Sequence, residues 1–120
     1  MIWHIDKSNP VCPQLAGQIA AGIAGGLFTP NEKLKSVREI AVEAGVNPNT
    51  VQKTLEQLEG DGLVYSVRGT GWFVSENTDA SQKWKSKMTK EKLDSFFGQM
   101  KSIGYSVSEI KKLVEEYEHE

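Results

Sequence analysis

The chain has 120 residues, of which 38% are hydrophobic and 25% charged, and its formal net charge is −2. This length allows one modest core with an appended helical element, and no apolar run approaches the ~20 residues that a membrane-spanning helix needs. The first ten residues have neither the basic start nor the apolar stretch of a signal peptide, so we expect a cytoplasmic protein that contacts no membrane.

Two elements are predicted near the N-terminus. Residues 2–6 (IWHID) alternate between apolar and polar side chains, which favours a short strand or an extended arm. The stripe formed by Leu15, Ile19 and Ile23 predicts a first helix over residues 13–25, which ends at two successive glycines. We expect the apolar side chains of the connection that follows to lean on the core.

The strongest local pattern is a pair of short helices. Ser36-x-x-Glu39 is a capping box, in which the hydroxyl and the carboxylate each accept a backbone N–H at the start of a helix. Gly45 suits the turn that ends this second helix, because a positive φ costs glycine little. Asn47 and Pro48 then suit the N-cap and the first position of a third helix.

The third helix is predicted over residues 48–59, with Val51, Leu55 and Leu58 facing inward. Its opposite face is polar and carries little charge. The run LVYSV-RGTG-WFVS then predicts a β-hairpin whose turn contains glycine and has Arg68 at its tip.

The composition changes after this hairpin. Residues 76–88 are polar and without periodicity, as in a linker. A helix is then predicted over residues 89–103, and a second capping box, Ser106-x-x-Glu109, opens a last helix. The predicted fold class is therefore α+β.

In this interpretation, residues 1–75 form a winged helix-turn-helix domain, residues 76–88 a linker and residues 89–120 a helical tail. Such a domain suits DNA binding, because the second helix of the pair fits the major groove while the wing lies on the backbone or in the minor groove. Amide side chains can pair with adenine, and lysine can donate to guanine. The candidate DNA contacts are Asn49, Thr50, Gln52 and Lys53 on the third helix, Ser36 and Arg38 at the start of the second, and Arg68 and Gly69 in the wing.

Net charge does not by itself indicate a DNA-binding surface. Residues 33–75 carry five basic side chains, Lys33, Lys35, Arg38, Lys53 and Arg68, against the acidic Glu39, Glu43, Glu56, Glu59 and Asp61. A neutral polar helix face could simply be solvated, and Arg38 could pair with Glu43 or a neighbouring acid for little gain at a surface. Binding to a polyanion would therefore depend on where the charges are placed.

Three stretches of the chain resemble the GntR family of bacterial transcriptional regulators, namely PQLAGQI, SVREIAVEAGVNPNTVQKTLEQLEGDGLV and RGTGWFV. The short tail is similar to that of the YtrA-like branch. The resemblance implies that Ser36, Arg38, the third helix and the wing contact DNA, and that the tail serves dimerisation. The chain departs from the family pattern at Asn31, at Lys35, and at Gln52 and Lys53, where the family has glycine, proline and often arginines.

The two predicted tail helices are too short to form a core alone, so their apolar faces need a further partner. An identical chain is the commonest partner. The residues expected at this dimer surface are Leu93, Phe96, Phe97, Met100, Val107, Ile110, Val114 and Tyr117.

No pattern in the chain indicates an enzyme, a metal site or a cofactor. The single cysteine, Cys12, excludes an intramolecular disulfide, and we expect it to be a small buried or half-buried residue. His4 and His119 are the only histidines, which is too few for a metal-ligand cluster. There is no pairing of a nucleophile with a base and no phosphate-cradling loop.

We therefore expect a homodimeric repressor that binds an inverted repeat in double-stranded DNA. Two alternatives stay open. In one, the regulator also binds an unidentified small-molecule effector, planar or cationic, in its dimer cleft. In the other, the winged helix is a protein-interaction adaptor that has lost DNA binding, which the neutral balance of residues 33–75 would fit.

Overall fold

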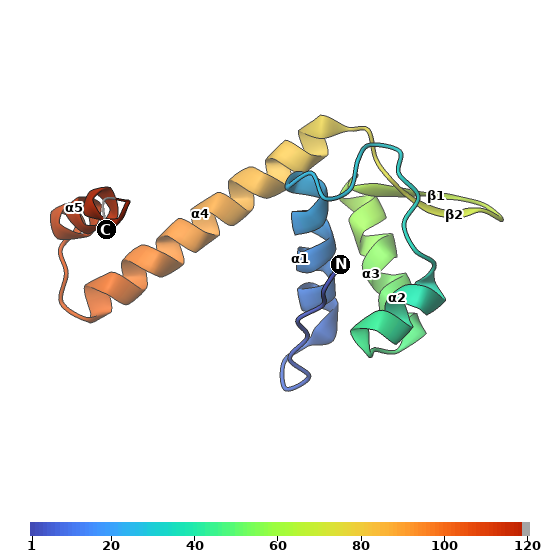
Figure 1. Ribbon diagram of the computed structural model, residues 1–120, viewed down its shortest axis with the longest axis horizontal. Helices are drawn as coiled ribbons and strands as arrows, with labels where there is room; N and C mark the ends of the chain where they lie inside the picture. Colours follow the sequence, from blue (N-terminus) through green and yellow to red (C-terminus); the bar gives the residue numbers. More distant parts are fainter. Residues whose placement is uncertain (119–120) are drawn as a thin grey trace. The chain divides into compact units, whose positions relative to one another are not determined.

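The structure is a computed structural model that describes residues 1–118, and it divides into two compact units between Lys85 and Ser86 (Figure 1). The α+β fold, a winged helix-turn-helix followed by two further helices, is confirmed. The elements in chain order are α1 (Val11–Ala24), α2 (Val37–Ala44), α3 (Pro48–Gly60), β1 (Val64–Val67), β2 (Gly71–Val74), α4 (Thr78–Ser102) and α5 (Val107–Tyr117).

The core of the first unit lies between α1 and α3, which pack against each other. Leu15 and Ile19 of α1 and Val51 and Leu55 of α3 are at most 1% exposed. Burying each such side chain contributes about 1.5–3 kcal/mol to the stability of the fold. The apolar stripe therefore fixes the orientation of α3 about its own axis. The polar residues of α3 outside this stripe are thereby turned toward solvent.

The caps predicted for the helix pair are present. Ser36 N–H donates to Glu39 Oε1 at 3.2 Å, and Glu39 N–H donates to Ser36 Oγ at 3.1 Å. Gly45 ends α2 with φ of 68°. Asn47 Oδ1 accepts the backbone N–H two residues later at 2.8 Å, and Pro48 occupies the first turn of α3. These local contacts set both ends of the turn between the two helices.

The predicted hairpin is also present, with β1 antiparallel to β2 and Val64 opposite Val74. Residues 31–34 lie along the other edge of β2: Leu34 N–H donates to the Trp72 carbonyl and Val74 N–H to the Glu32 carbonyl, each at 2.9 Å. This pairing was not predicted. It requires a left-handed residue at Asn31, whose φ is 65°, a conformation that asparagine tolerates better than most residues.

The N-terminal segment forms the extended arm and not the strand that the alternation also allowed. Two glutamines of α1 take the place of a neighbouring strand. Gln18 accepts from His4 N–H at 3.0 Å and donates to the His4 carbonyl at 2.8 Å, and Gln14 makes the same pair of bonds with Asp6, each at 2.8 Å. Side-chain amides can replace a strand here because each offers one acceptor and a donor side by side.

The prediction of a linker over residues 76–88 is wrong, because α4 begins at Thr78. Asn77 Oδ1 accepts the backbone N–H of Asp79 at 3.0 Å, which caps the new helix. Ala80 and Trp84, one turn apart, pack against the core of the first unit. The helix was missed because these two contacts are tertiary, whereas the local composition is polar.

In the second unit, α4 ends before Gly104 and α5 begins at the second capping box, as predicted. Ile110 was expected at the dimer surface, but it is 0% exposed within the single chain. It is the one buried side chain among residues 86–118. Its burial inside the unit holds α5 in place, and the remaining apolar side chains are left at or near the surface.

Three features concern membrane spanning, metal binding and cysteine chemistry. Within residues 1–118 no helix is both long and apolar enough to cross a membrane, and no three metal-ligating side chains come together. Cys12 is a half-buried free thiol whose sulfur lies 3.2 Å from Thr54 Oγ1, as expected for a residue packed beside the core. His119 lies outside the described residues.

The capping box of α2 predicts an acid-sensitive contribution to stability. The pKa of Glu39 is lowered, chiefly because its carboxylate accepts the Ser36 backbone N–H. A carboxyl with a lower pKa in the folded state stabilises the fold above its unfolded pKa, about 4.3, and loses that effect as the pH falls through the folded pKa. Glu39→Gln keeps an acceptor but does not titrate. It should therefore reduce the loss of unfolding free energy between about pH 6 and pH 3.

Urea unfolding across that pH range measures this effect. Asp61→Asn is the control, because it removes an exposed carboxylate of the same unit that forms no capping box. An identical pH dependence in the wild type and Glu39→Gln would contradict the role given to the capping carboxylate.

Candidate nucleic-acid interface

The outward face of α3 carries the four residues predicted to read DNA. Asn49, Gln52 and Lys53 are exposed, and Thr50 is half-buried. Lys53 forms no ion pair among residues 1–118, so its ammonium group is available to an external acceptor. Gln52 does have a partner, since its Nε2 donates to Glu56 Oε1 at 3.0 Å. The face is therefore mostly open, with one internal hydrogen bond.

Ser36 and Arg38 lie at the start of α2 and are exposed. The Ser36 hydroxyl accepts a bond in the capping box, which leaves its own hydrogen to donate elsewhere. Arg38 makes no ion pair within the part of the chain that is described. The alternative in which Arg38 pairs with Glu43 is therefore wrong, and its guanidinium group stays available.

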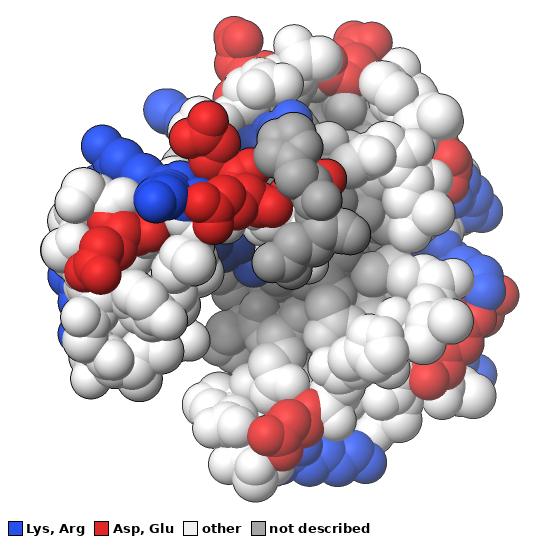
Figure 2. All heavy atoms as spheres, turned by 60° about the vertical axis from the view of Figure 1, so that its left-hand side comes forward, with Lys and Arg blue, Asp and Glu red and all other residues white. Residues whose placement is uncertain are grey.

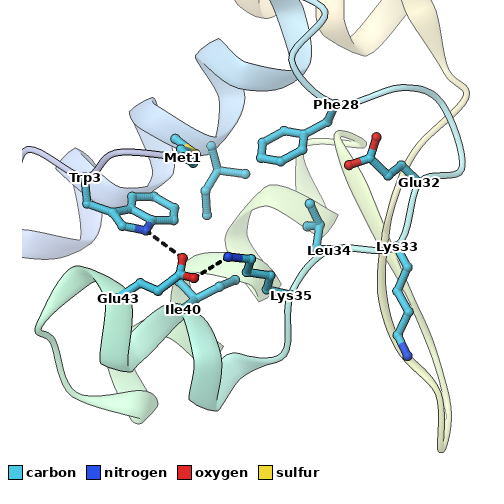
Figure 3. Close-up of a pocket in the computed structure, with 10 residues that line it drawn as sticks. Met1, Trp3, Phe28, Glu32, Lys33, Leu34, Lys35, Ile40 and Glu43 are labelled. Atoms are coloured by element: carbon cyan, nitrogen blue, oxygen red, sulfur yellow. Dashed lines mark hydrogen bonds and ion pairs between the residues drawn. The ribbon is translucent and has the colours of Figure 1, made fainter.

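Glu43 instead joins three segments of the first unit (Figure 3). Its carboxylate accepts from Trp3 Nε1 at 3.4 Å and forms an ion pair with Lys35. The hydrogen bond from Lys35 lowers the pKa of Glu43, and the same bond raises the pKa of Lys35. The N-terminal arm is thus tied to α2 and to the residue that directly precedes Ser36.

A cavity of about 240 Å³ lies beside this contact, between the arm, α1, α2 and residues 32–35 (Figure 3). Its walls are mostly apolar and include Trp3, Phe28, Leu34 and Ile40, with Glu43 and Lys35 among its polar lining. Sequence reasoning did not find this cavity, because it depends on the arm reaching α2. The sequence signal for such a contact was the presence of apolar residues in the arm, among them Trp3 and Ile5, which pack against the core.

Arg68 and Gly69 lie in the turn between β1 and β2, since Val67 pairs with Gly71. The hairpin itself is seen in Figure 1. Thr70 N–H donates to the Val67 carbonyl at 2.9 Å, and Gly69 has φ of 78° at the third position of this turn. Positive φ at that position is the reason for glycine in a tight turn. Arg68 is exposed and has no ion pair among the residues described, so the turn carries a cation at its tip.

One carboxylate attaches the wing to α3. Glu59 Oε2, near the end of α3, accepts from both the backbone N–H and the hydroxyl of Ser66 in β1, each at 3.0 Å. Sequence reasoning missed this pair because the two residues lie in different elements. As a result, the α3 face and the wing tip belong to one connected framework.

Acidic groups are engaged within the protein more often than basic ones at this interface. Glu39, Glu43 and Glu59 each accept hydrogen bonds that hold an element in place, whereas Arg38, Lys53 and Arg68 make no ion pair in residues 1–118. Figure 2 brings forward the side of Figure 1 on which α4 and α5 lie, and blue and red side chains are interspersed on that face. The interface is neutral in sum, because residues 33–75 carry as many basic as acidic side chains, but its unpaired cations are free to meet a polyanion.

Comparisons with known proteins identify the family to which the chain belongs. Residues 13–74 match the family described as bacterial regulatory proteins, gntR family. The chain is 37% identical over 107 residues to an uncharacterized HTH-type transcriptional regulator, YhcF, of Bacillus subtilis (strain 168), covering 89% of this chain and 88% of that protein. It is 32% identical over 111 residues to the HTH-type transcriptional repressor YtrA of the same organism, covering 92% and 85%.

Solved structures show the same relationship. A GntR family transcriptional regulator from Listeria monocytogenes matches with a TM-score of 0.84 at 30% identity, over 93% of this chain and 98% of that one. A crystal structure of AraR(DBD) in complex with operator ORE1 matches with a TM-score of 0.54 at 33% identity, over 56% and 82%. The protein therefore belongs to the GntR family and is a DNA-binding transcriptional regulator, not an enzyme.

Proposed function

We propose that the protein is a repressor that binds an inverted-repeat operator as a homodimer, with α3 of each copy in the major groove of one half-site. The observation that carries this proposal is the open face of α3, where Lys53 has no internal ion pair among residues 1–118. The repressor role is supported by the similarity to YtrA, which is named a repressor.

The exposed side chains suit distinct parts of a DNA site. Asn49 and Gln52 can each pair with adenine through two hydrogen bonds, and Lys53 can donate to guanine O6 and N7. Thr50 can contact a thymine methyl group or a phosphate. Contacts to the DNA backbone from other elements would position α3 without reading the base sequence. This role suits the side chains of Ser36, Arg38 and Arg68, and Gly69 has no side chain to keep the wing away from the DNA backbone.

The second unit supplies the surface that we assign to dimerisation. An apolar groove of about 460 Å³ is lined by Phe96, Met100, Leu113, Val114 and Tyr117. Val114 is 51% exposed and Tyr117 is 77% exposed. Such exposed apolar side chains in one small unit favour a partner surface.

An identical chain related by a two-fold axis would cover this groove and match the symmetry of an inverted repeat. The proposed dimer surface also includes Leu93, Phe97 and Val107, with Ile110 buried beneath it. In a dimer, binding to the second half-site becomes intramolecular, which raises the affinity although each half-site is bound in the same way. This compensates for the neutral charge of each DNA-binding unit.

The first test addresses base contact by Lys53. Lys53→Ala should weaken binding to the specific operator by about 1–3 kcal/mol, because it removes a hydrogen-bond donor to a base edge. Binding to random DNA should change much less. Titrations of the variant against both DNAs at one salt concentration measure the difference, and an equal loss on both would identify Lys53 as a phosphate contact.

The second test addresses the wing. Arg68→Ala should weaken binding to all sequences alike, and the slope of log K against log salt concentration should flatten by about one unit for each phosphate that the wing no longer neutralises. Lys112→Ala, which removes a cation from the face of α5 away from the groove, is the control. If the slope of Arg68→Ala equals that of the wild type, the wing does not touch the DNA backbone.

The same titrations test the alternative of a protein-interaction adaptor. If the protein were such an adaptor, the wild type would bind no DNA even at low salt.

The third test addresses the dimer in the full-length chain. Val114→Glu places a charge in the apolar groove, so it should give a monomer whose affinity for a single half-site is unchanged. Its affinity for the complete inverted repeat should fall toward the half-site value, because a monomer has no second α3 held near the other half-site. Lys112→Ala, which changes the net charge by the same one unit, is the matched control on the opposite face of α5.

Sedimentation measures the mass in solution, and titration of half-site and full-site duplexes measures the affinities. A Val114→Glu protein that is still dimeric, or a monomer that binds the inverted repeat as tightly as the wild type, would show that the groove is not the functional dimer surface.

A further inference from the structure

Glu56 is an acidic side chain on the face of α3 that carries the proposed base contacts. At about 100° per residue, it lies nearly two turns after Asn49 and points within about 20° of the same direction. Gln52 is its neighbour one turn earlier. A carboxylate on this face repels DNA phosphates, and so it opposes the electrostatic attraction that supplies non-specific binding.

The other glutamates of α2 and α3 have structural tasks that explain their presence. Glu39 caps α2, Glu43 holds the N-terminal arm and Glu59 holds the wing. Glu56 has no such task. Within residues 1–118 its side chain makes one hydrogen bond, in which Gln52 Nε2 donates to Glu56 Oε1 at 3.0 Å. The bond joins two exposed residues of one helix, so it does not connect elements of the fold.

This bond fixes which way the Gln52 amide faces. An ionised carboxylate can only accept, so the amide nitrogen and not its oxygen must be turned toward Glu56. One N–H of Gln52 is used in the bond, while the second N–H and the carbonyl oxygen stay available. These two groups lie side by side when Glu56 takes the N–H on the far side from the carbonyl oxygen. Adenine presents an acceptor at N7 and a donor at N6, which match that remaining pair.

We propose that Glu56 is a positioning residue that orients the Gln52 amide to read adenine and that its charge lowers binding to DNA of other sequences. This rests on the proposed function, because it requires α3 to enter the major groove. Orienting the amide before binding removes an entropic cost from the specific complex alone. The carboxylate charge opposes every complex, so the two effects together raise the ratio of specific to non-specific affinity.

The test uses the full-length protein and a library of duplexes with a randomised centre, from which the wild type first selects its site. Every base pair of the selected half-site is then substituted in turn. Gln52→Ala, Glu56→Ala, Glu56→Asp and the double variant Gln52→Ala with Glu56→Ala are titrated against each duplex and against random DNA. Asp61→Asn controls for the loss of one exposed carboxylate that has no bond to Gln52.

The wild type should prefer adenine at one position of each half-site by roughly 5-fold to 100-fold, and Gln52→Ala should abolish this preference. Glu56→Ala should reduce it by about twofold or more and should bind random DNA more tightly than the wild type. Glu56→Asp keeps an anionic acceptor one turn from Gln52, so it should retain the preference. Asp61→Asn should also retain it, and the double variant should discriminate no worse than Gln52→Ala.

Several results would overturn the proposal. An adenine preference that disappears in Gln52→Ala but is unchanged in Glu56→Ala would show that the amide needs no orienting partner. A base preference that does not change in Gln52→Ala would reject the reading of adenine while leaving the proposed function intact. If the wild type selects no sequence from the library, the proposed function fails as well, and the two failures are thereby distinguished.

Discussion

The burial of one face of α3 is the constraint on which the rest of the interface depends. Val51 and Leu55 are completely buried and Leu58 is 2% exposed, so rotating the helix by even one residue position would move apolar side chains into water. The buried Thr54 fits the same surface by donating its hydroxyl to the Thr50 carbonyl at 2.7 Å. Core packing therefore determines which side chains of α3 face solvent, and the proposed DNA contacts are among these.

The interface also shows how a neutral domain can serve a polyanionic partner. Most acidic side chains of α2 and α3 are bound to other groups of the protein: one is in a helix cap, one is in an ion pair and one holds the wing. The cations at Arg38, Lys53 and Arg68 are left open. A hydrogen bond from a neutral group leaves a carboxylate charged, so Glu39 and Glu59 still contribute to the field that a phosphate meets. The cations differ because they have no internal partner among residues 1–118 and can move to contact a phosphate directly.

Sequence reasoning predicted those parts of the fold whose cause is local. The capping box at Ser36, the left-handed Gly45 and the glycine turn beside Arg68 each follow from residues within a few positions of one another. The parts that it missed depend on distant partners. Gln14 and Gln18 replace a strand for the arm, and the start of α4 depends on packing against the first unit, which the polar local sequence does not reveal.

The candidate site divides in the same way. Its exposed residues on α3 and in the wing were predictable, because a helical period and a hairpin pattern place them outside the core. The burial of Ile110 was not predictable, since an apolar stripe does not say whether its partner is the same chain or another one. The bond between Gln52 and Glu56 has a recognisable spacing of four residues, but its proposed role depends on both side chains lying on the face of α3 that we propose meets DNA.

The attachment of Ser66 to Glu59 makes the reading helix and the wing a preorganised pair. A mobile wing would lose conformational entropy when it binds DNA. A wing that is already attached to α3 has lost that entropy during folding, so binding costs less. A rigid pair has a further consequence, because a shift of one member displaces the other. In the proposed complex, the position of the wing on the sugar-phosphate backbone would then set the depth and tilt at which α3 meets the bases, so the attachment at Ser66 would contribute to sequence discrimination without contacting a base.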